Sequence, residues 1–332
     1  MRRRYFLGSA MAGGALPAAA SAAQEPASFR TTQQADVVLD RPQSGKPHAG
    51  KVLAAIQPHC DDIPIFAGGT VLKLIDEGYR GFLIRTSNDE MAGSGATVGE
   101  VVLNNERDTL EVTRRLGLEK LYTLGCRNHM MDGSSSSSCA RGSSSSSACS
   151  RSTPSFATTP GATTKRTPTT TSAQSVEAAC WMSGGRWDYP EHFEAGLARN
   201  RSEKYYFSRG PQLVNRVVDI SPYMDRKVDV NLANVTQGPA GENGSRLRRS
   251  LAQQGRKLPL LGDDDDTANR AYIKDLVFHD DAPSSANNTA SPVTFHYIGP
   301  TEEYATRASS AKHGRAVGLR ALSTAQPQSW LR

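Results

Sequence analysis

Short apolar runs alternate with amphipathic stretches along the first part of the chain. The apolar runs have the length and composition of strands and lie at Val52–Ile56, Gly81–Thr86 and Lys120–Leu124. The stretches between them, Val71–Glu77 and the one that leads to Leu116, have helical spacing. This order predicts an α/β fold, with a Rossmann-like, mainly parallel sheet flanked by helices.

Polar residues follow each of these predicted strands. The loops are Pro58-His59-Cys60-Asp61-Asp62 after the first strand, Asn88 and Asp89 after the second, and Arg127-Asn128-His129 after the third. Ligand sites in parallel sheets lie at the carboxyl ends of the strands. We therefore expect the three loops to meet at one edge of the sheet and to form one site.

The loop after the first strand combines an imidazole with two carboxylates. A neutral imidazole and a carboxylate are ligands of a zinc-like ion, and His59 and Asp62 have the spacing to share one. Asp61 would then stand beside the ion as a base that takes a proton from bound water. In the alternative interpretation, Asp61 or Asp62 is the N-cap of the following helix and His59 is a hydrogen-bonded loop residue.

The stretch from residue 51 to 128 resembles the PIG-L/LmbE-like family of zinc-dependent N-acetylglucosaminyl deacetylases, whose hallmark is an (A)HPDD(E) loop after the first strand. The resemblance continues through Phe66-Ala67-Gly68-Gly69-Thr70, the second strand, the polar loop Ser87-Asn88-Asp89-Glu90 and the third strand, in the family's order. Two residues depart from the hallmark, since Cys60 replaces the usual Pro and Ile63 the usual acid. Neither change removes a liganding group.

The resemblance implies roles for the site residues. His59 and Asp62 would bind Zn²⁺ or another divalent metal, and Asp61 would be the general base. The nucleophile would be a water that the metal activates, and the reaction would be hydrolysis of an N-acetyl or other N-acyl group on an amino sugar or glycoconjugate. The candidate substrate-binding residues, all in the loops at the same edge, are Asn88, Asp89 and Asn128.

The composition changes after the third predicted strand. Serine runs at Ser134–Ser138 and Ser143–Ser147 lead into small polar residues, so we interpret 134–171 as a low-complexity insert without enough apolar residues for a core. The resemblance implies a further metal ligand in this part of the chain, from a (H/N)PDH motif. None of the seven histidines lies between His129 and His192, so we expect the chain as written to be inactive or nearly so.

A reading-frame hypothesis accounts for this gap. The segment from Arg151 onward can be read in another frame, in which the last base of each codon is joined to the first two bases of the next codon. The genetic code then permits the amino-acid sequence VDTV, followed by two residues and YDPWGHYEENPDHY. A histidine codon then spans Thr169 and Thr170, and family-like sequence resumes at Ala173. We infer that Arg151–Thr171 is translated out of frame. Codons at Thr169 and Thr170 that cannot yield CAC or CAT across their boundary would exclude this hypothesis.

Composition and the first residues bear on partners and location. The chain has 332 residues, and 39 basic and 33 acidic side chains give a net charge of +6. The basic residues lack the aromatic interleaving of a nucleic-acid surface, so we expect no nucleic-acid partner.

The apolar stretch from Met1 to about Ala23 has the zones of a signal peptide, and Arg3–Leu7 resembles a twin-arginine signal, with a Sec signal as the alternative. We expect export to the periplasm, cell envelope or medium. No other run approaches the roughly 20 apolar residues of a membrane span.

The expected organisation is a signal peptide at 1–23, a deacetylase-like domain at 48–280 interrupted by 134–171, and a polar tail at 281–332. Late in the domain, Asp225–Gln237 predicts a closing helix. Its end, Asn234-Val235-Thr236-Gln237, stands where related proteins tend to carry a His-x-Ser/Thr-Gln element. The sequence leaves the oligomeric state open.

Two other functions are compatible with the sequence. One is a non-catalytic exported carbohydrate-binding or scaffold protein that keeps the fold after losing the metal. The other is an unrelated exported metalloprotein whose site uses the thiolate of Cys60. Because the related proteins carry Pro at this position, and Pro cannot bind a metal, we favour a Cys60 that is not a ligand.

Overall fold

The computed structural model describes residues 37–128, 155–158, 168–185, 187–199, 202–207, 214–278 and 292–298. The signal peptide, the serine runs and His129 lie outside the described residues. None of the helices in these ranges is both long enough and apolar enough to cross a membrane.

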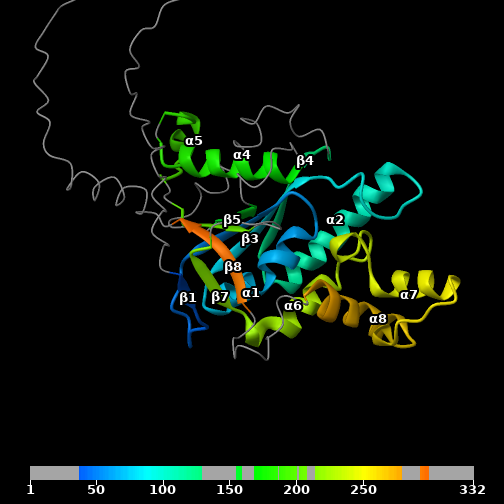
Figure 1. Ribbon diagram of the computed structural model, residues 1–332. Coiled ribbons are helices and arrows are strands. Elements are labelled where there is room, and N and C mark those ends of the chain that lie inside the picture. Colours follow the sequence, from blue (N-terminus) through cyan, green and yellow to red (C-terminus); the bar gives the residue numbers. More distant parts are fainter. Residues whose placement is uncertain are drawn as a thin grey trace, which may run out of the picture. The chain divides into compact units, whose positions relative to one another are not determined.

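The described strands form one sheet of eight strands in the order β1-β7-β8-β6-β5-β2-β3-β4 (Figure 1). Their bounds are β1 Val38–Asp40, β2 Val52–Gln57, β3 Arg80–Ser87, β4 Lys120–Cys126, β5 Ser155–Thr158, β6 Lys204–Phe207, β7 Arg216–Asp219 and β8 Pro292–Ile298. Neighbouring strands are parallel except where β8 pairs with β6 and β7. The mainly parallel α/β sheet that the sequence predicts is confirmed.

Helices cover both faces of this sheet. The α-helices are α1 Gly68–Asp76, α2 Val98–Arg115, α4 Pro168–Met182, α5 Pro190–Glu194, α6 Met224–Asn231, α7 Gly244–Gln253 and α8 Asp265–Ala271. Shorter helical segments are η1 Ile63–Ala67, η2 Ser221–Tyr223, η3 Pro239–Gly241, η4 Pro259–Leu261 and η5 Tyr272–Val277. In Figure 1, α4 lies on one side of the strands, and α1, α2 and α6 lie on the other.

Strand β2 shows why both faces need helices. Leu53 and Ala55 are buried in the core cluster that includes residues of α1 and α2. Ala54 and Ile56 point the other way, into a cluster with Val176 of α4. A strand with apolar residues on both faces, as β2 has from Val52 to Ile56, is stable only when both faces are covered, and β2 meets this condition.

Two parts of the expected low-complexity insert form regular structure. Ser155–Thr158 is a strand that pairs with β2 on one side and with β6 on the other. Pro168–Met182 is one helix, so α4 begins before Ala173, where family-like sequence was expected to resume. These two stretches of the predicted insert take part in the fold, and the rest of 134–171 lies outside the described residues. This short polar strand is stable because β2 and β6 supply its backbone hydrogen bonds. The pattern of residues within the strand does not predict this pairing.

The sheet also extends beyond both expected ends of the domain. Strand β1 precedes residue 48, and β8 follows residue 280 and lies between β6 and β7. The apolar residues of β8, including Phe295, are flanked by polar sequence on both sides. The sequence therefore predicted no strand here and only a short apolar stretch within the polar tail 281–332. The partners of these residues are distant in sequence, and Phe295 is fully buried against them.

Helix α2 begins with a capping arrangement that involves Thr97 and Glu100. Thr97 Oγ1 accepts a hydrogen bond from the backbone N–H of Glu100, and Glu100 Oε2 accepts one from Ala96. Replacing Thr97 by Ala should lower the free energy of unfolding by about 1 kcal/mol, because one helix donor loses its partner. Urea denaturation measures this change, and Thr97→Ser, which keeps the hydroxyl, should remain close to the parent. An unchanged stability in Thr97→Ala would contradict the assignment of this cap.

Candidate active site

The loop between β2 and η1 folds back on itself through Asp62. Asp62 Oδ2 accepts a hydrogen bond of 2.9 Å from the backbone N–H of His59. Asp62 is also the residue that precedes η1, but its side chain makes no capping bond to that segment. The N-cap interpretation of Asp62 is therefore not supported, because its carboxylate is directed toward His59.

The His59 ring lies between a carboxylate and an amide. Its Nδ1 is 3.2 Å from Asp62 Oδ2, and its Nε2 is 3.3 Å from Asn128 Oδ1. Burial lowers the pKa of His59, but the hydrogen bond and charge of Asp62, with the charges of Asp89 and Asp61, outweigh it and raise the pKa to about 9. The carboxylates around the ring therefore favour positive charge at this position.

The spacing of His59 and Asp62 suits a zinc ligand pair. Two ligands about 2.0–2.1 Å from a tetrahedral ion lie about 3.3 Å apart, close to the 3.2 Å between Nδ1 and Oδ2. If Nδ1 faces the ion, Nε2–H donates to the Asn128 carbonyl, the kind of second contact that orients a metal-binding histidine. Within the described ranges, however, no group of three His, Cys, Asp or Glu side chains is placed to hold a metal.

Asp61 and Cys60 are joined by one glutamine. Gln237 Nε2 donates to Asp61 Oδ2 at 3.4 Å, and its Oε1 accepts from Cys60 Sγ at 3.1 Å. Burial, followed by the charges of Asp89 and Asp61, raises the pKa of the Cys60 thiol, so the thiol stays protonated and donates. Because the thiol fixes which end of the amide faces it, the NH₂ group of Gln237 is turned toward Asp61.

Asp89 lies beneath the site and is fully buried. Its Oδ2 accepts from the backbone N–H of Cys60, and its Oδ1 accepts from Ser87 Oγ, both at 2.9 Å. Asn105 of α2 donates to the Asp89 carbonyl at 3.2 Å. This geometry indicates that Asp89 positions the loop that carries His59 and Asp61. Its expected contact with substrate stays a prediction that these bonds do not support.

The third loop is held by Glu90. Its Oε2 accepts from the backbone N–H of Asn128 at 2.8 Å, and its Oε1 is 3.4 Å from Arg127 Nε. Asn88 is only half-buried, and its Oδ1 accepts from the Glu90 N–H at 3.3 Å. The structure thus brings His59, Asp62 and Asn128 into direct contact. The substrate contacts of Asn88 and Asn128 stay predictions.

The structure adds Gln237, Asn105 and Glu90 to this site, and the sequence predicts none of the three. Gln237 had a signal, since it ends the segment that resembles a family element, but the expected helix did not place it. Helix α6 ends at Asn231, and the chain then turns so that Gln237 reaches Asp61. Asn105 and Glu90 had no such signal, because each acts through a hydrogen bond to a residue that is distant in sequence or to backbone.

No family model and no curated protein matches the chain. Solved structures do resemble it. N,N'-diacetylchitobiose deacetylase from Pyrococcus horikoshii aligns with a TM-score of 0.56 and 17% identity, over 78% of this chain and 87% of that chain. 4-Carboxy-2-hydroxymuconate hydratase from Pseudomonas putida KT2440 aligns with a TM-score of 0.50 and 13% identity, over 75% and 96%. A zinc-inhibited form of teicoplanin deacetylase gives a TM-score of 0.46 and 9% identity, over 75% and 98%.

These likenesses establish the fold. The resemblance to LmbE-like deacetylases is confirmed at this level, because the deacetylase from P. horikoshii shares the architecture over most of both chains. The hydratase shares the architecture as well. The fold alone therefore does not determine the reaction, which has to be argued from the residues of the site.

Proposed function

We propose that this chain carries the active-site scaffold of a hydrolase that removes an N-acetyl group from an amino sugar or glycoconjugate. One observation carries the proposal: His59, Asp61 and Asp62 lie together at the carboxyl end of β2, with His59 and Asp62 at the separation of zinc ligands. The fold shared with a diacetylchitobiose deacetylase supports the substrate class.

The side chains divide the chemistry between them. A zinc ion held by His59 and Asp62 would polarise the amide carbonyl and lower the pKa of water. Asp61 accepts the proton of the attacking water and delivers it to the leaving amine. Gln237 donates its Nε2–H to Asp61 Oδ2 at 3.4 Å and thereby orients the carboxylate that takes the proton.

In the described part of the chain, His59 and Asp62 are the two ligands that are placed to share an ion. Catalytic zinc sites use three protein ligands and keep one position open. We therefore propose that the literal chain is inactive or nearly so, and that the third ligand belongs to the segment 151–171 read in the shifted frame.

Zinc binding tests this part of the proposal. The literal chain should bind zinc roughly 100-fold more weakly than a chain whose residues 151–171 are translated in the shifted frame. Losing a residue that only orients a metal ligand already weakens metal binding by about 10–100-fold, and losing the ligand itself should cost at least as much. Competition with a chromophoric chelator gives both affinities, and His192→Gln in the literal chain serves as the control for a substitute ligand. If both chains bound one zinc ion with equal affinity, and His192→Gln did not change this affinity, the proposal that the literal chain lacks a metal ligand would be refuted.

A product assay tests the reaction itself. With N,N'-diacetylchitobiose as substrate and zinc present, the shifted-frame chain should release acetate and leave a free amine in equal amounts. The hydration chemistry of the other fold neighbour would release neither product. Zinc bound in full without any acetate release from this substrate or from N-acetylglucosamine would count against the proposed function.

The alternative function is that of a non-catalytic carbohydrate-binding protein that keeps the fold. Glycan binding that is unaffected by chelator and by Asp61→Ala would favour this alternative.

A further inference from the structure

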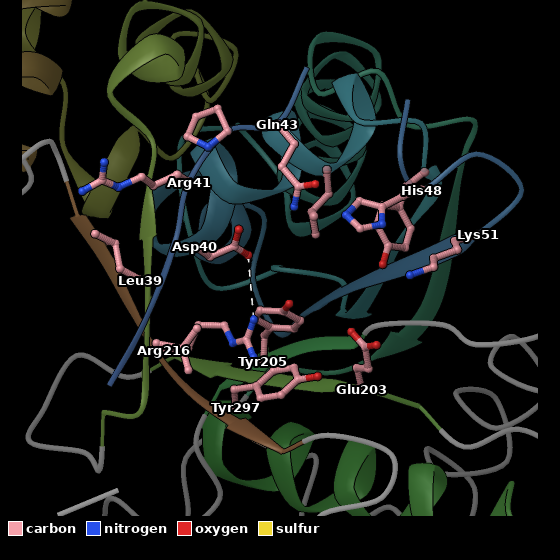
Figure 2. A pocket seen from close by; sticks show the side chains of 14 residues that line it. Leu39, Asp40, Arg41, Gln43, His48, Lys51, Glu203, Tyr205, Arg216 and Tyr297 are labelled. Atoms are coloured by element: carbon pink, nitrogen blue, oxygen red, sulfur yellow. Dashed lines mark ion pairs between the residues drawn. The ribbon is translucent and has the colours of Figure 1, made fainter. Parts of the chain in front are cut away.

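A cavity lies at the opposite edge of the sheet from His59, where the parallel strands β2, β3, β6 and β7 begin. Its volume is about 500 Å³, within the range of about 300–1,000 Å³ that is typical of small-molecule sites. It is bounded by residues at the amino ends of β6 and β7, by the chain that leaves β1, and by the residues that precede β2 and β3 (Figure 2). It therefore shares no residue with the candidate active site.

Tyrosine rings form one wall of this cavity. Tyr205 packs edge-on against Tyr297 with ring centroids 4.9 Å apart, and Arg216 covers the Tyr297 ring at 3.8 Å. Tyr79 packs against His48 at 4.8 Å on the other side. These contacts hold the rings in place before any ligand arrives, which lowers the entropy that binding would cost.

Hydrogen-bonding groups converge on the same space. Figure 2 shows Asp40, Gln43 and Glu203 around the cavity, with Tyr205 beside them. Burial, followed by the charge of Glu203, raises the pKa of Tyr79, so its hydroxyl remains a donor next to that carboxylate. The cavity thus offers acceptors and donors side by side.

The charges of the cavity nearly cancel. Asp40 is 3.0 Å from the buried ammonium of Lys73 and 3.9 Å from Arg216, so its charge is already balanced by the protein. The other charged residues of the lining are Glu203, Lys51 and the exposed Arg41, so the cationic side chains of the lining exceed its carboxylates by one. Charges of both signs are therefore present, and a neutral ligand with many hydroxyl groups can use both kinds of partner.

We propose that this cavity binds a neutral saccharide. A sugar presents an apolar face of C–H groups to the tyrosine wall and a rim of hydroxyls to Glu203, Gln43 and Lys51. The inference is independent of the proposed hydrolysis, because it rests on residues at the other edge of the sheet. If both proposals hold, the chain anchors a glycan at one edge of the sheet and acts on an N-acetyl group at the other.

Isothermal titration of the full chain tests the proposal with maltose, which lacks an N-acetyl group, and with inorganic phosphate and putrescine as charged probes. Maltose should bind, and Glu203→Gln should weaken it about tenfold because a charged hydrogen-bond partner is lost. Tyr205→Phe provides a second variant, and thermal unfolding verifies that each variant is folded. Asp61→Asn and the exposed Lys257→Gln should leave maltose affinity unchanged.

Three results would overturn the assignment. One is the absence of maltose binding to the folded parent chain. Another is maltose binding that Asp61→Asn abolishes while Glu203→Gln and Tyr205→Phe preserve it, because the sugar would then occupy the other edge of the sheet. The third is binding of a charged probe that displaces maltose, either putrescine binding that is lost in Glu203→Gln or phosphate binding that is lost in Lys51→Gln, which would make the cavity a site for a charged ligand.

Discussion

Replacing Asp61 by Asn should slow acetate release by about 10²–10⁴-fold in the chain whose residues 151–171 are translated in the shifted frame, the range expected when a general base is removed. Asp61 is 2% exposed and lies next to the proposed metal ligands His59 and Asp62. Few other groups could therefore accept the proton of the attacking water in place of Asp61. Asn preserves the shape of the side chain and still accepts from Gln237, but it cannot accept a proton from water. Initial rates at saturating substrate measure the change in kcat.

The matched control for this variant is its neighbour Asp62. Asp62→Asn removes a proposed metal ligand, so zinc affinity and activity should fall together, whereas Asp61→Asn should keep its zinc and lose only the rate. A normal rate in Asp61→Asn with full zinc would remove this residue from the mechanism. A rate that more zinc restores would instead make Asp61 a metal-binding residue.

The first half of the sheet was predictable because its signals are local. Strands β2, β3 and β4 are apolar runs separated by amphipathic helices, and the observed bounds differ from the expected ones by one or two residues at the ends. In a parallel unit of this kind, the carboxyl ends of the strands must meet, so the position of His59 followed from the strand order.

The second half was not predictable, because its strands depend on partners distant in sequence. Ser155–Thr158 has one aromatic residue in polar surroundings and becomes a strand only between β2 and β6. Strand β8 reverses direction and lies between β6 and β7, a placement that no periodicity encodes. The same distance explains the site: Gln237 meets Asp61 across 176 residues of sequence.

The sequence alone could not distinguish between two roles for Asp89. A carboxylate at the end of a strand fits a substrate-binding residue as well as a buried support, and only burial distinguishes the two. The structure places Asp89 at 0% exposure with both carboxylate oxygens bonded to the protein. A polar residue at the end of a strand can therefore either face the ligand or, as the bonds of Asp89 indicate, hold in place the loop that carries the ligand-facing residues.

The support role leads to the largest stability effect that we expect. Asp89→Ala should lower the free energy of unfolding by about 3–5 kcal/mol, the range for removing one member of a buried charged pair. The variant would leave the guanidinium of Arg85, which is 3.9 Å from Asp89 and 2% exposed, without its carboxylate. It would also leave the Cys60 N–H and the Ser87 hydroxyl without their acceptor. Urea denaturation at neutral pH measures the difference.

Two further substitutions separate the side chain from the backbone. Asp89 has a positive φ of 55°, a conformation that Gly adopts freely, that Asn tolerates and that costs Ala about 1–2 kcal/mol. Asp89→Gly should therefore be more stable than Asp89→Ala by about that amount, and Asp89→Asn, which keeps an acceptor oxygen, should be the most stable of the three. If Asp89→Asn and Asp89→Gly were equally stable, the hydrogen bonds to Cys60 and Ser87 would contribute little. If all three matched the parent, Asp89 would not support the loop, and its substrate-binding role would become the better explanation of its position beside His59.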